Sequence, residues 1–66
     1  MHEIDIWRVA NLLIKDYGEE AVFLASKRAD ALLDLGDAEG FAVWLKVVKA
    51  IDMLERQGHA EGETIN

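Results

Sequence analysis

Cysteine and proline are both absent from this chain of 66 residues. The lack of cysteine excludes disulfides and thiolate metal sites. The two histidines, His2 and His59, lie near the ends of the sequence and make poor metal ligands. Ser26 is the only serine, and Thr64 falls in a polar C-terminal stretch. Because nucleophilic groups, thiolates and imidazoles are so scarce, we predict that the protein is not an enzyme and holds no cofactor or metal.

The sequence also lacks long apolar runs and a basic leader. The opening residues MHEIDIW do not resemble a signal peptide, which needs a basic start and an extended apolar core. The uninterrupted apolar runs are far shorter than the roughly 20 residues that span a bilayer. The sequence therefore predicts a cytoplasmic location and no membrane partner.

Positive charge is in short supply, since seven basic residues face thirteen acidic ones and the net charge is −6. Duplex DNA and anionic membranes attract basic surfaces, so we expect no direct binding to nucleic acid. A helix-turn-helix reading also fails, because Asp37 and Glu39 would lie where base contacts are usually made. A protein partner fits this charge better.

Glycine residues divide the sequence into three predicted helical segments. Gly18, Gly36 and Gly58 each stand where a periodic apolar pattern stops, as expected of helix C-termini. The spacing predicts helices over about 4–17, 19–35 and 37–57, which form one domain over residues 1–57. The polar stretch 58–66 is predicted to be a flexible tail.

Each predicted helix has one apolar face when its residues are placed at 100° intervals. Trp7 and Trp44 fall on these faces, where we expect them to anchor the core. Short connections make consecutive helices neighbours. The expected fold is all-α: a small three-helix bundle, or a helical hairpin with one more helix packed on it.

Three large apolar residues, Leu12, Phe23 and Leu45, fall on the polar faces of the three helices. Single exposed apolar residues are common on protein surfaces. One on each helix of so small a chain could instead mark an interface with another protein or a second copy. Both interpretations remain open from the sequence.

Arg28 is the opposite case, a charged residue inside the apolar face of the second helix. Its stem could lie along the core with the guanidinium in solvent. Alternatively, the guanidinium could pair with a carboxylate of another helix or of a partner, the intramolecular candidates being Asp5, Asp16 and Glu55.

The acids of the second and third helices resemble neither a metal site nor a phosphate loop. Asp30 and Asp34 share a helix face, but magnesium or calcium needs a fuller cage of oxygen ligands, so a solvated acidic face is expected. In the segment LGDAEGFAVW, Asp37 is predicted to cap the third helix, with its carboxylate accepting hydrogen bonds from backbone N–H groups of the first turn. Gly40 has no explanation from the sequence.

The segments IWRVANLLIKDYGEEA and ASKRADALLDLGDAEGFAVW resemble an uncharacterised family of short bacterial helical proteins. The resemblance implies a free-standing small helical protein and brings no known activity, substrate or catalytic residue. Arg28 and Asp30 are the polar positions of the matched pattern that it singles out for examination.

Two functions follow as hypotheses. The first is a non-enzymatic interaction or regulatory protein that binds a protein partner, or itself as a homo-oligomer. The expected partner-binding residues are Leu12, Phe23, Arg28, Asp30, Asp34 and Leu45. The alternative is an acidic inhibitor, or nucleic-acid mimic, that occupies the basic groove of another protein.

Overall fold

The computed structural model describes residues 2–56, apart from the side chain of Glu3, and within them the chain is helical with no strand. The elements are α1 (Glu3–Tyr17), the short 3₁₀ turn η1 (Gly18–Glu20), α2 (Ala21–Asp34) and α3 (Ala38–Arg56). The all-α class is confirmed. The second helix begins later than predicted because Gly18–Glu20 forms the 3₁₀ turn. The predicted tail, residues 58–66, lies outside the described residues.

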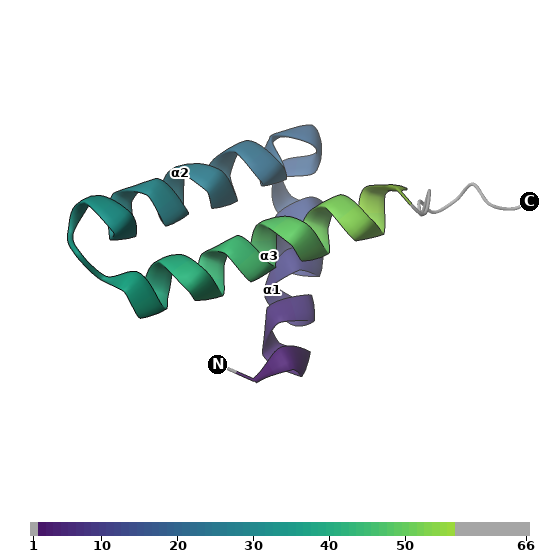
Figure 1. Cartoon of the computed structure of the whole chain (residues 1–66). Coiled ribbons are helices and arrows are strands. Elements are labelled where there is room, and N and C mark those ends of the chain that lie inside the picture. Colours follow the sequence, from purple (N-terminus) through teal and green to yellow (C-terminus); the bar gives the residue numbers. More distant parts are fainter. Residues whose placement is uncertain (1, 57–66) are drawn as a thin grey trace, which may run out of the picture.

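Helices α2 and α3 form an antiparallel hairpin, and α1 crosses this hairpin near its open end (Figure 1). The three helices therefore do not run alongside one another over their whole lengths. None of the described helices is long and apolar enough to cross a membrane.

The core is built mainly from small residues where the three helices meet. Five of its eight buried apolar residues are alanines, and only Ile6, Val47 and Ile51 are larger. Ala21 and Ala25 present almost no side chain on the inner face of α2, which lets the neighbouring helix backbones approach closely. A core of this kind buries little apolar area, so the stability it supplies is small.

The corner between α2 and α3 follows the predicted capping pattern. The N–H of Gly36 donates to the carbonyl of Leu33 and the N–H of Asp37 to that of Leu32, at 3.0 and 2.9 Å, while Gly36 has a φ of 82°. These are the two hydrogen bonds of a Schellman motif, in which glycine adopts the left-handed conformation without steric cost. Gly36 therefore ends α2 as expected.

Asp37 caps α3, also as expected, and the cap explains Gly40. A carboxylate oxygen of Asp37 accepts a hydrogen bond of 2.9 Å from the N–H of Gly40. A Cβ atom placed on Gly40 would lie 2.6 Å from the other carboxylate oxygen. Glycine at this position lets the capping carboxylate lie directly against the first turn of the helix.

Several apolar residues are more exposed than their helix faces predict. Leu33 and Leu35, near the α2–α3 corner, are exposed, as is Tyr17 at the end of α1. Trp7 is not an anchor inside the core but lies at its edge, with 36% of its surface exposed. For Leu33 and Leu35 the physical reason is that α1 covers only the open end of the hairpin (Figure 1), so no third helix covers the corner end.

Candidate protein-interaction surfaces

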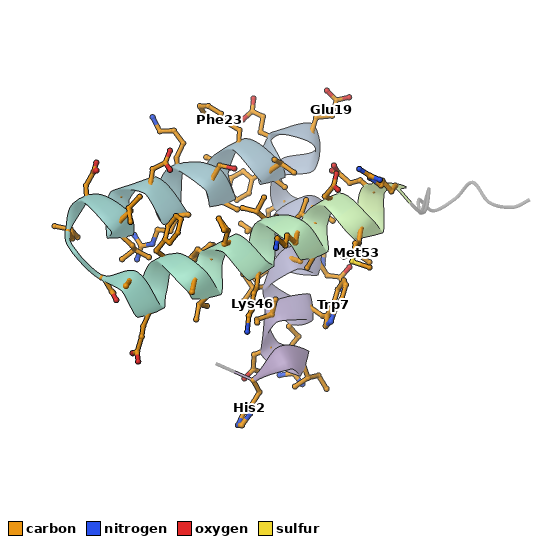
Figure 2. The ribbon with its side chains drawn as sticks, in the orientation of Figure 1. His2, Trp7, Glu19, Phe23, Lys46 and Met53 are labelled. Carbon is orange, nitrogen blue, oxygen red and sulfur yellow. The ribbon has the colours of Figure 1, made fainter. Side chains whose placement is uncertain are left out.

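The outer face of α2, formed by Phe23, Lys27, Asp30 and Asp34, brings together three of the predicted partner-binding residues. These positions share one side of the helix, opposite the buried Ala21 and Ala25, and all four are exposed. Phe23 points away from the molecule (Figure 2) and is 60% exposed. The Nζ atom of Lys27 lies 5.5 Å from the centre of the Phe23 ring. The α2 outer face thus combines an accessible aromatic ring with charges of both signs.

Leu12 and Leu45 are also exposed, but they lie on other helices. Leu12 on α1 is 58% exposed and Leu45 on α3 is 36% exposed. Each lies on the side of its helix away from that helix's buried residues, so neither belongs to the α2 outer face. The three apolar residues singled out by the sequence are therefore distributed over three helices.

Arg28 turns toward α3 and contacts an aromatic ring. Its Cζ atom lies 5.9 Å from the centre of the Trp44 ring, within the range of a cation–π interaction. Asp5, Asp16 and Glu55 all lie beyond ion-pair distance of Arg28, so none of the three expected pairings forms. The guanidinium joins the two arms of the hairpin at the level of Trp44, which is half-buried.

The acidic residues of the described chain are predominantly solvated. Two exposed ion pairs are present in this part of the chain, Arg8 with Asp5 at 3.9 Å and Arg56 with Asp52 at 3.2 Å. Asp30 and Asp34 take part in neither pair. No group of three potential metal-ligating residues occurs among the side chains that the structure describes. The chemistry available to Asp30 and Asp34 is therefore long-range attraction of positive charge.

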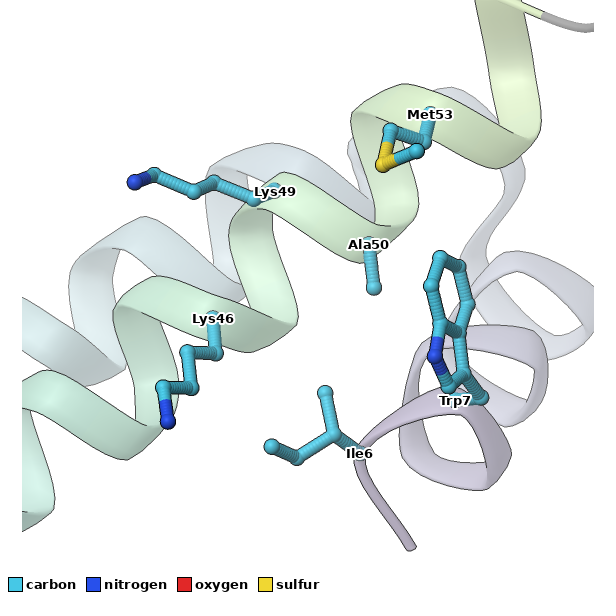
Figure 3. Close-up of a pocket in the computed structure, with 6 residues that line it drawn as sticks. All are labelled: Ile6, Trp7, Lys46, Lys49, Ala50 and Met53. Atoms are coloured by element: carbon cyan, nitrogen blue, oxygen red, sulfur yellow. The ribbon is translucent and has the colours of Figure 1, made fainter. Parts of the chain in front are cut away.

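A second candidate surface, the α1–α3 cleft, was not foreseen from the sequence. It has a volume of about 190 Å³ and opens where α1 crosses α3. Its lining consists of Ile6, Trp7, Lys46, Lys49, Ala50 and Met53. The indole of Trp7 stands beside Ala50, whereas Lys46 and Lys49 extend away from the indole along the same helix (Figure 3). The floor is apolar, and the charged side chains that the structure describes in the lining, Lys46 and Lys49, are basic.

Part of this cleft had a signal in the sequence. Lys46, Lys49 and Met53 lie on one flank of α3 by helical spacing alone, at the border of its apolar face. Trp7 lies on α1, and helical spacing does not predict where α1 crosses α3. The sequence could therefore have supplied one wall of the cleft but not the other.

Comparison with family models, with curated proteins and with solved structures found no match to this chain. The resemblance to a family of short bacterial helical proteins thus remains a prediction.

Proposed function

We propose that this protein is a non-enzymatic interaction or regulatory module that binds another protein, or a second copy of itself, through exposed apolar residues surrounded by acids. One observation carries the proposal. Nine large apolar side chains are exposed within residues 2–56, against three that are buried in the core. Burying exposed apolar surface in an interface lowers the free energy by roughly 25 cal/mol per Å².

Phe23 is the best candidate for the centre of such an interface. Aromatic residues are enriched at interfaces and contribute a large apolar area at low entropic cost. The ring of Phe23 is accessible on the α2 outer face, with the ammonium of Lys27 over it and Asp30 about one turn beyond Lys27. Charged groups at the rim of an apolar contact select partners by complementarity rather than by adding affinity. Leu12 and Leu45 offer secondary contacts on the other two helices.

The test compares Phe23→Asp with Ala31→Asp. Both positions are exposed on α2 and both changes add one negative charge, but only the first removes a large apolar side chain. We expect Phe23→Asp to weaken association at least about tenfold, as loss of an interface hot spot does. Light scattering over a concentration series measures self-association, and cross-linked capture from cells with the two variants as bait measures binding of other proteins.

Helical circular dichroism of both variants verifies that they are folded. The proposal is wrong if the unmodified protein stays monomeric throughout the series and both baits capture the same proteins in the same amounts. A complex that Ala31→Asp disrupts as strongly as Phe23→Asp would show that charge alone, rather than the aromatic ring, determines binding.

The second candidate is an acidic inhibitor that occupies a basic groove of another protein. It is favoured by Asp30 and Asp34, which are exposed on the α2 outer face and take part in neither ion pair of residues 2–56. A captured complex of this kind should dissociate as NaCl is raised from about 0.05 M to about 0.5 M, since screening shortens the reach of the charges. Asp30→Lys should weaken it more than Asp16→Lys, a matched change at an exposed residue of α1.

A further inference from the structure

We propose that the α1–α3 cleft binds an acidic amphipathic segment of a partner protein, with one large apolar side chain between Trp7 and Met53 and carboxylates beside Lys46 and Lys49. This inference rests on the proposed function, since it identifies one surface through which the module meets its partner. It concerns a different surface from the α2 outer face.

The size of the cleft favours a side chain over a free small molecule. Its volume of about 190 Å³ is below the roughly 300–1,000 Å³ of typical small-molecule sites. It is also several times the roughly 30 Å³ that one water molecule occupies in the liquid. One anchoring side chain of a larger ligand matches this space, with the rest of that ligand lying across the rim.

The walls of the cleft have the composition of an interaction site. Trp7 and Met53 remain 36% and 49% exposed beside the buried floor of Ile6 and Ala50. Tryptophan is the residue most enriched among interface hot spots, and methionine adapts its flexible side chain to irregular partners. An apolar side chain inserted here would remove the exposed edge of the indole from water.

The charge of the rim determines the chemistry of the partner. Four of the seven basic residues have a partner within residues 2–56: Arg8 and Arg56 form ion pairs, and Lys27 and Arg28 contact aromatic rings. The other three, Lys15, Lys46 and Lys49, have neither kind of contact with the side chains of residues 2 and 4–56, and two of them line the cleft. A chain of net charge −6 thus presents two lysines at this cleft. Acidic groups flanking the anchor would complement them.

The experiment uses a synthetic helical peptide of about twelve residues as the probe, with leucine at i, i+3, i+4 and i+7 and glutamate elsewhere. Binding is followed by NMR through the indole N–H signals of Trp7 and Trp44. We expect saturable movement of the Trp7 signal and little change at Trp44, which packs against the core within the hairpin. A peptide with glutamine in place of glutamate is the control and should bind more weakly.

Lys46→Gln and Lys49→Gln should each weaken binding of the acidic peptide about fivefold, the effect of losing one solvent-exposed ion pair. Lys15→Gln removes the same charge on α1, outside the cleft, and should have less than about a twofold effect. Met53→Gln should also weaken binding, because it places an amide where the apolar anchor would lie.

Three results would overturn the inference. The glutamine peptide could bind as tightly as the acidic one, or Lys15→Gln could weaken binding as much as Lys46→Gln. The Trp7 signal could also move with protein concentration alone, which would identify a second copy as the occupant. Because Phe23 lies outside the cleft, each of these results leaves the comparison of Phe23→Asp with Ala31→Asp intact.

Discussion

Arg28 and Trp44 join the two arms of the hairpin through a contact of 5.9 Å between the guanidinium carbon and the ring centre. The sequence does not predict this contact. From the sequence, an arginine on an apolar face was expected to reach solvent or to pair with a carboxylate. The indole face offers a third solution, because its negative quadrupole attracts the cation while the planar guanidinium stacks on the ring.

Arg28→Ala should lower the free energy of unfolding by about 0.5–1 kcal/mol, the value of a cation–π contact at an exposed site. Arg28→Lys keeps the charge but loses planar stacking, so it should recover only part of this loss. Urea denaturation followed by tryptophan fluorescence measures both variants. Equal stability of Arg28→Ala and the unmodified protein would mean that the contact contributes nothing.

Capping residues were the most predictable part of the molecule. Asp37 and Gly36 follow rules that involve only a few neighbouring residues, so the sequence indicated their roles directly. Gly40 needed the structure, because the closeness of the Asp37 carboxylate depends on the rotamer of that side chain. The exposure of Trp7 likewise depends on where α1 crosses α3, which the sequence neighbours of Trp7 do not determine.

At the scale of elements, the corner between α2 and α3 depends on the conformation of Gly36, whose φ is 82°. Gly36→Ala should cost about 1–2 kcal/mol, since a Cβ is disfavoured in the left-handed region. Gly36→Asn should cost less, because asparagine tolerates this region better than other residues with side chains. Urea denaturation of the two variants provides the measurement, and an alanine variant as stable as the asparagine variant would contradict the expectation.

The alanines of α2 set how closely this helix packs against its neighbours. Ala25 is 1% exposed, so Ala25→Leu must displace a neighbouring helix and should cost about 1–3 kcal/mol. Ala31→Leu places the same side chain on the exposed side of α2 and should leave the free energy of unfolding nearly unchanged. Thermal unfolding of both variants checks this. Similar melting temperatures would mean that the space around Ala25 can accommodate a leucine side chain.

Helix positions could be predicted to within a few residues because periodicity and glycine act locally. The crossing of α1 over the open end of the hairpin could not. The apolar face of a helix indicates which of its residues could be buried. How many of them α1 buries depends on the path of the chain through Gly18–Glu20. Leu33 and Leu35 show the consequence, since both belong to an apolar face that extends beyond α1.

For the whole molecule, the net charge of −6 opposes compaction, and the exposed pairs Arg8–Asp5 and Arg56–Asp52 offset this repulsion only in part. Moderate NaCl should therefore stabilise the fold by screening repulsion. A gain of about 1 kcal/mol would raise the melting temperature by about 4–8 °C in a chain of this size. Dilute samples keep self-association out of the measurement.

A variant that combines Asp30→Asn with Asp34→Asn is the matched control, because it lowers the net charge from −6 to −4 without changing the core. Its melting temperature should respond less to NaCl. A melting temperature that falls as salt is added would show that favourable ion pairs outweigh the repulsion.

Because α1 covers only the open end of the hairpin, backbone amides along a single helix should exchange with deuterium at very different rates. Amides of Val47–Ile51 lie where all three helices meet and should exchange only through global unfolding, whereas those near Leu32–Phe41 should exchange through local opening of the corner. Hydrogen exchange measured by NMR would detect this gradient. Uniform rates along α3 would show instead that the hairpin opens as one cooperative unit.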